Sequence, residues 1–166
     1  MKWLALALLL VWGPALAGPG RLKPALTPVV VCATSRGVAI STPGSLQFFD
    51  RSGKAVWSGE SVQAPTAASV TSDRIAIIDS INNEVRIAAL ADGQGKTIRV
   101  GETPIEGIFI DRDLFLLERD ARTLERVAPD GTRSSLALPA DPAFLRQVGG
   151  RLYVYARTDE IGRAHV

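Results

Sequence analysis

The sequence predicts an all-β protein, and three observations carry that prediction. Prolines recur at a nearly constant interval, a short apolar segment follows each of them, and polar or glycine-containing turns separate these segments. The segments are rich in Val, Ile, Leu, Phe and Tyr, and several alternate with the period of two that is typical of a strand. After residue 17 no stretch has the periodicity of a helix.

Residues 1–17 resemble a secretory signal peptide. Lys2 supplies a positive start, residues 3–12 form an unbroken apolar run, and Ala15-Leu16-Ala17 has the small-x-small pattern of a cleavage site. Such a run rises only about 15 Å as a helix, roughly half of the hydrocarbon core of a bilayer. We therefore expect cleavage after Ala17, a linker at residues 18–27, and a periplasmic or secreted protein without a membrane span.

Four prolines open similar segments along the rest of the chain. Pro28, Pro65, Pro104 and Pro142 are spaced 37, 39 and 38 residues apart. We expect a first strand after each proline and, beyond a short turn, a second one. The first strands are VVVCAT, TAASV, IEGIFI and AFLRQV, and the second strands are GVAIS, RIAIIDS, DLFLLER and RLYVYAR.

In three of the four copies, a third strand leads through a glycine turn into a fourth. These pairs read SLQFFD-RSG-KAVWSG, EVRIAAL-ADGQG-KTIRV and TLERVAP-DG-TRSSLAL. Aspartate and glycine suit such turns because both tolerate the backbone conformations that a tight hairpin needs.

A repeated unit of about forty residues with four strands is typical of a β-propeller blade. The sequence therefore predicts an incomplete β-propeller of about three and a half four-stranded antiparallel blades, each of about 38 residues. We expect blades at residues 28–64, 65–103 and 104–141 and a partial blade at 142–160. A β-sandwich with regularly spaced prolines is the alternative.

Residues 98–131 resemble the YVTN-type repeat of secreted bacterial propellers and, less closely, the NHL-type repeat. The shared features are Val100-Gly101 followed by Pro104, the strand Leu152-Tyr153-Val154 and the turn Asp130-Gly131. The resemblance extends over residues 28–160 and implies a secreted propeller. Its pattern encodes architecture, which is compatible with many functions.

The two ends also determine the charge. Residues 161–166 (IGRAHV) resemble the translation of a common DNA-sequencing adapter, so we expect them to be an artefact and the chain to be an N-terminal fragment. Lys2 and Arg163 account for the formal net charge of +2, and the middle of the chain is neutral. Because no Lys/Arg cluster occurs there, we expect no nucleic-acid partner.

Polar residues gather where the loops between second and third strands meet the crossovers between blades. In a four-stranded meander these segments lie on one face, which we call the loop face. Loops that surround a propeller's channel commonly form its binding site. We predict that five residues bind a ligand. The alternative for each of them is that it is a solvated loop residue without a binding role. They are Asp79, Asn83, Glu118, Arg119 and Glu106.

The residues for catalysis or metal binding are scarce. The single His, His165, lies in the adapter-like tail, so a nucleophile would lack its usual base. One Cys without a genuine His cannot form a zinc site. We predict no catalytic residue, metal or cofactor. We expect Cys32 to be a small buried hydrophobe and Trp57 to pack between blades.

The sequence thus predicts an exported propeller scaffold that binds a protein, a glycan or a small ligand through loops on one face. The alternative is a propeller enzyme of the lactonase or periplasmic dehydrogenase type, with its catalytic residues in further C-terminal blades. A structural role in an envelope assembly is the third possibility.

Overall fold

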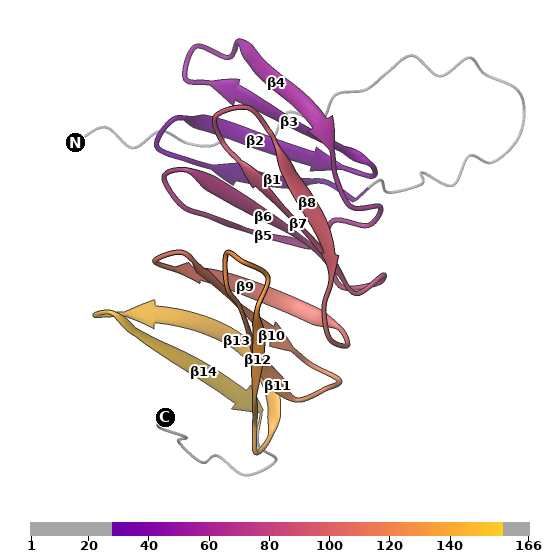
Figure 1. Cartoon of the computed structure of the whole chain (residues 1–166), viewed down its shortest axis with the longest axis vertical. Coiled ribbons are helices and arrows are strands. Elements are labelled where there is room, and N and C mark those ends of the chain that lie inside the picture. The colour runs from indigo at the N-terminus through magenta and orange to yellow at the C-terminus, as the bar shows by residue number, and fades with distance from the viewer. Residues whose placement is uncertain (1–27, 158–166) are drawn as a thin grey trace, which may run out of the picture.

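The computed structural model describes residues 28–157, and every regular element in this part of the chain is a β-strand (Figure 1). The expected signal peptide, the linker and residues 158–166 lie outside the described residues. The strands are β1 (Val30–Ala33), β2 (Gly37–Thr42), β3 (Ser45–Asp50), β4 (Ala55–Glu60), β5 (Ala67–Val70), β6 (Arg74–Asp79), β7 (Glu84–Ala89), β8 (Gly95–Arg99), β9 (Pro104–Ile110), β10 (Asp113–Glu118), β11 (Thr123–Val127), β12 (Arg133–Ala137), β13 (Asp141–Val148) and β14 (Arg151–Arg157).

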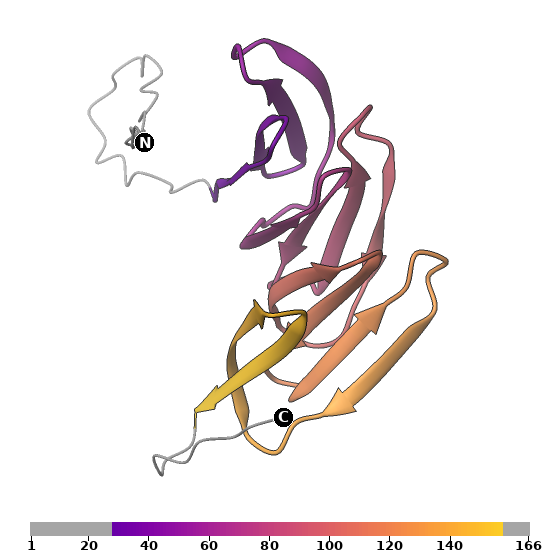
Figure 2. The ribbon, with the colours of Figure 1, turned by 90° about the vertical axis from the view of Figure 1, so that its left-hand side faces the viewer.

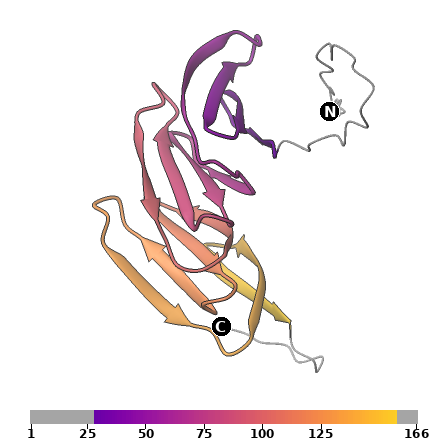
Figure 3. The same cartoon turned by 90° about the vertical axis from the view of Figure 1, so that its right-hand side faces the viewer.

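The strands form three four-stranded sheets and one two-stranded sheet, each an antiparallel meander in chain order. We call them blade 1 (β1–β4), blade 2 (β5–β8), blade 3 (β9–β12) and half-blade 4 (β13–β14). The sheets follow one another along a curved stack (Figures 2 and 3), and each first strand lies beside the first strand of the next sheet. The described residues thus form an arc of blades, as the sequence predicted.

The core lies between the blades rather than inside any one of them. Along β6, Ile75 and Ile77 pack toward blade 1, whereas Ala76 and Ile78 pack toward blade 3. All four side chains are at most 1% exposed. Burial of an isoleucine contributes roughly 1.5–3 kcal/mol, so a strand that is apolar on both faces holds two interfaces together.

Trp57 illustrates how a blade interface is filled. Its indole Nε1 donates a hydrogen bond to the Leu90 carbonyl oxygen at 3.0 Å, and its ring stacks on Phe48 with centroids 5.8 Å apart. The ring also covers Gly93, where the φ of +74° favours glycine and a Cβ would approach the indole within 2.6 Å. The prediction that Trp57 packs between blades is confirmed.

Cys32 packs against the same interface. It is half-buried beside the cluster that Phe48 and Ile75 belong to, and burial raises the pKa of its thiol. A thiol in this state is a poor nucleophile, in line with its predicted packing role.

Replacing Trp57 with alanine is expected to lower the free energy of unfolding by about 2–3 kcal/mol, because it removes the indole packing and one hydrogen bond. Urea unfolding followed by circular dichroism measures the change. The neighbouring Val56, which is 49% exposed, provides the control, and V56A should cost less than about 0.5 kcal/mol. Equal losses in the two variants would contradict the role assigned to Trp57.

Candidate functional site

On the loop face, the same backbone hydrogen bond between a loop and a crossover recurs in each of blades 1, 2 and 3. The segments of this face are the loops 43–44, 80–83 and 119–122 and the crossovers 61–66, 100–103 and 138–140. In each loop, one residue with a positive φ accepts a hydrogen bond from the crossover that leaves its blade, and these φ values are 72°, 58° and 52°. The bonds run from Ser61 N to Gly44 O (3.2 Å), from Val100 N to Asn83 O (3.0 Å) and from Leu138 N to Arg122 O (2.8 Å).

Asp79 lies at the end of β6 and is fully buried. Its Oδ1 accepts the backbone N–H groups of Ile81 (3.0 Å) and Asn82 (2.8 Å). Its Oδ2 accepts the Ala64 N–H and the Asn82 side-chain amide, each at 2.8 Å. Since a carboxylate has about four acceptor sites, contact with a ligand would require one of these bonds to break.

Glu118 occupies the equivalent place at the end of β10 and is 3% exposed. Its Oε1 accepts the Gly101 N–H at 2.6 Å, and its Oε2 accepts the Thr123 hydroxyl at 2.5 Å. A Cβ on Gly101 would lie 2.2 Å from Glu118 Oε2, so a larger residue there would displace the carboxylate from its present position. Like Asp79, Glu118 ties the crossover that enters its own blade to the strand end.

The carboxyl of Glu118 is unusual because a second buried carboxyl, Glu125, lies beside it. Burial, together with the hydrogen bond and the charge of Glu125, raises the pKa of Glu118 to about 7. Glu125 is 5% exposed and pairs through Oε1 with Arg133, whose own pKa is raised mainly by that hydrogen bond. Glu125 Oε2 has no donor of its own, and the hydrogen bond between the two carboxyls forms only when Glu118 carries a proton.

The other three predicted residues have different environments. Asn83 Oδ1 accepts the Thr103 N–H at 2.8 Å, so its side chain also ties a loop to a crossover. Arg119 has an exposed side chain, and only its backbone is held, through a 3.0 Å bond from its N–H to Thr103 O. The structure thus brings Asp79, Asn83, Glu118 and Arg119 to the loop face.

Glu106 requires a correction, because it was predicted among the loop-face residues but lies within β9, the strand that the sequence analysis expected as IEGIFI. Its Oε2 accepts the Leu145 N–H at 2.6 Å, and its Oε1 pairs with Arg146 Nη1 at 2.9 Å. Pro104 begins the strand in the structure, so Glu106 has already turned toward β13. It links blade 3 to half-blade 4.

The side chains that the loop face exposes to solvent are not the carboxylates of Asp79 and Glu118, which are buried. Ile81 is 74% exposed in the loop of blade 2, and Arg119 of blade 3 and Arg157 of half-blade 4 are also exposed. A cavity of about 200 Å³ is lined by Arg119, Asp141, Pro142, Ala143 and Arg157. Sequence reasoning missed Ile81, although an isoleucine directly after Asp-Ser in a polar loop is the available signal.

The opposite edge of the blades carries the turns 34–36, 51–54, 71–73, 90–94, 111–112, 128–132 and 149–150, and we call it the turn face. A second cavity opens there between blades 2 and 3, among residues that the sequence analysis did not select. Within residues 28–157, no group of three or more His, Cys, Asp or Glu side chains is placed to hold a metal ion. That part of the chain also has no helix with the length and apolarity of a membrane span.

The comparisons with known proteins support the fold. No protein-family model matches the chain, and no curated protein is similar to it in sequence. Among solved structures, it is similar to BBS1N in complex with ARL6DN (TM-score 0.60, 16% identity, 77% of this chain and 47% of that one). It also resembles virginiamycin B lyase from Staphylococcus aureus (TM-score 0.60, 15% identity, 77% and 48%). A third is the dihydro-heme d1 dehydrogenase NirN (TM-score 0.61, 11% identity, 74% and 30%).

These neighbours are propeller-like proteins, and at such low identity they establish the fold alone. The chain has the fold of an incomplete β-propeller, as predicted. It spans less than half the length of each structure compared here.

Proposed function

We propose that the chain is part of an exported propeller scaffold that binds a protein partner through the loop face. The observation that carries this proposal is the way the loops are held. Asp79 accepts the backbone N–H groups of Ile81 and Asn82, and the Arg119 N–H is held by Thr103 O. The exposed side chains of Ile81 and Arg119 therefore stand on loops whose backbones are fixed. Preorganised loops lose little entropy on binding, and arginine is enriched among residues that dominate protein interfaces.

The size of the cavity favours a protein over a small ligand at this face. Small-molecule sites occupy about 300–1,000 Å³, whereas the cavity beside Arg119 has about 200 Å³. The likeness to BBS1N in complex with ARL6DN supports the same choice, since that propeller-like protein has a protein partner. The signal-like residues 1–17 and the resemblance to secreted YVTN-type repeats support export.

The experiment identifies a partner and then tests the face. The purified chain captures proteins from the envelope and secreted fractions of the source organism, and the direct affinity of each purified candidate is measured by biolayer interferometry. The double variant I81D/R119E should weaken the affinity by roughly 30-fold or more, which corresponds to the loss of one hot spot. The control R36E reverses an exposed charge in the turn 34–36 and should leave the affinity unchanged. A partner that binds I81D/R119E as tightly as the unmodified chain would refute the proposal.

The second candidate is a propeller enzyme, favoured by the likeness to a lyase and a dehydrogenase. In that case further blades carry the catalytic residues and the blades described here only complete the ring. This candidate predicts that no protein is captured through Ile81 and Arg119, so the same experiment separates the two functions.

A further inference from the structure

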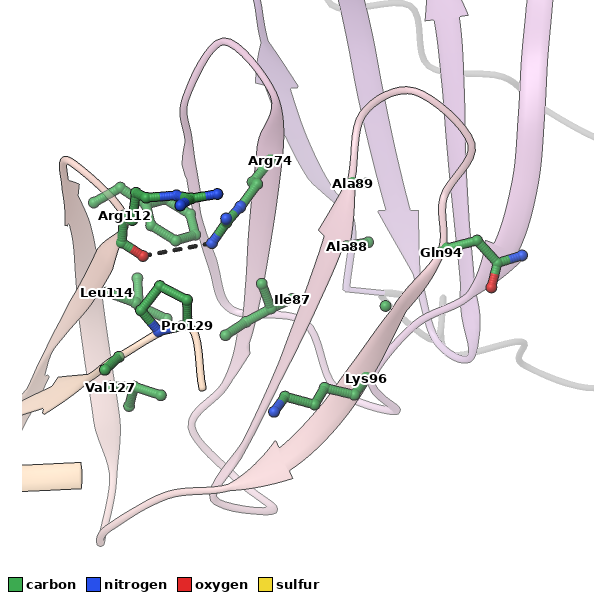
Figure 4. A pocket seen from close by; sticks show the side chains of 13 residues that line it. Arg74, Ile87, Ala88, Ala89, Gln94, Lys96, Arg112, Leu114, Val127 and Pro129 are labelled. Atoms are coloured by element: carbon green, nitrogen blue, oxygen red, sulfur yellow. Dashed lines mark hydrogen bonds between the residues drawn. The ribbon is translucent and has the colours of Figure 1, made fainter. Parts of the chain in front are cut away.

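The cavity on the turn face lies in the groove between blades 2 and 3 and has a volume of about 450 Å³, which is within the range of small-molecule sites (Figure 4). Three cationic residues line it, and its walls include Ile87, Val127 and Pro129. In Figure 4, Arg74 and Arg112 lie together at one end and Lys96 extends toward the apolar wall from the other. No Asp or Glu is among the lining residues.

The repeat explains why this groove is open. Trp57 pairs with Phe48 across β3 and β4, and Lys96 pairs with Ile87 at the same register of β7 and β8, thirty-nine residues further along. Trp57 covers Gly93 in blade 2, and Lys96 Nζ comes within 3.4 Å of a Cβ built on Gly131 in blade 3. Lys96 therefore takes the place of the indole that fills the preceding groove.

The cations of the groove are only weakly neutralised. Among the described residues, Arg74 pairs with Asp73 at 3.8 Å from Nε, and the Asp73 side chain is 70% exposed, while neither Lys96 nor Arg112 forms an ion pair. Arg74 Nη1 donates to the Arg112 carbonyl oxygen at 3.5 Å, so the Arg74 guanidinium lies beside the backbone of Arg112. Three cations around an apolar slot favour a ligand with one anionic group and an apolar body.

We propose that this groove binds a small aromatic carboxylate. The ring of the ligand occupies the position between blades 2 and 3 that is equivalent to the position of the Trp57 indole between blades 1 and 2. The carboxylate pairs with the cations at the mouth. The ring lies against Ile87 and Pro129. The site is on the turn face, away from the proposed protein surface, so each can fail without the other.

Indole-3-acetate is the probe, because it combines the ring system of Trp57 with one carboxylate. Calorimetric titration of the full chain should give a dissociation constant on the order of 0.1–1 mM, as expected for a ligand of this size. Indole-3-ethanol, which has the ring without the charge, should bind about tenfold more weakly. The variant K96W should abolish binding, because its indole would fill the groove as Trp57 fills the preceding one.

Ser134 supplies the matched control for K96W. It lies thirty-eight residues after Lys96, pairs with Arg126 at the same register of blade 3 and is exposed, so S134W adds the same side chain away from the groove. S134W should retain binding, and circular dichroism checks the fold of both variants. If K96W does not fold, K96A and R112Q replace it and should each weaken binding at least threefold. Absence of binding to the unmodified chain, equal affinity for indole-3-ethanol, or undiminished binding by the Lys96 variants would overturn the proposal.

Discussion

Replacing Asp79 with alanine is expected to destabilise the protein by about 3–5 kcal/mol. The carboxylate is fully buried and accepts four hydrogen bonds, so its removal leaves the N–H groups of Ala64, Ile81 and Asn82 without their partner. Those donors belong to a loop and to the crossover from the preceding blade. The loss therefore loosens the loop face and the connection between blades 1 and 2 together.

Chemical unfolding in urea, followed by circular dichroism, measures the effect of D79A. Asp92 is the matched control because it is an exposed aspartate whose Oδ1 accepts a single backbone N–H, that of Gln94, at 2.9 Å. D92A should cost less than about 1 kcal/mol. A similar cost for D79A and D92A would show that the bonds of Asp79 contribute nothing beyond those of a surface turn.

Glu118→Gln is expected to remove most of the pH dependence of stability between about pH 4.5 and 7. Folding raises the pKa of Glu118 from 4.5 to about 7, so the folded protein binds a proton that the unfolded chain has already lost in this range. The stability from that proton is fully present below pH 4.5 and is lost as the pH rises through 7. The total loss reaches at most about 3 kcal/mol.

Glutamine reproduces the protonated state at every pH. Its carbonyl oxygen can accept the Gly101 N–H, and its uncharged amide can donate a hydrogen bond as the protonated carboxyl does. Urea unfolding at pH 5, 6, 7 and 8 should give a falling free energy for the unmodified protein and a flatter one for E118Q. The exposed Glu102 in the neighbouring crossover is the control, and E102Q should keep the slope. An E118Q slope equal to that of the unmodified protein would contradict the raised pKa.

Much of the fold could be predicted because its signals are local. The continuous apolar runs in RIAIID and DLFLLE mark strands that are buried on two faces, and Asp-Gly pairs mark turns between third and fourth strands. The position of Asp79 and Glu118 at strand ends also follows from chain order. Glu106 was assigned to the loop face although the predicted strand IEGIFI contains it, and chain order alone does not show that its carboxylate pairs with β13 of the next blade.

The sequence by itself determined the strands, their meander order and the face on which the polar loops gather, since each depends on neighbouring residues and on the period of the repeat. Only the tertiary structure decided what those polar residues do. Asp79 and Glu118 bind backbone N–H groups of Ala64 and Gly101, residues 15 and 17 positions away. A carboxylate carries no mark of whether it faces a ligand or a backbone donor. That choice is made when the crossover brings an N–H within about 3 Å of it.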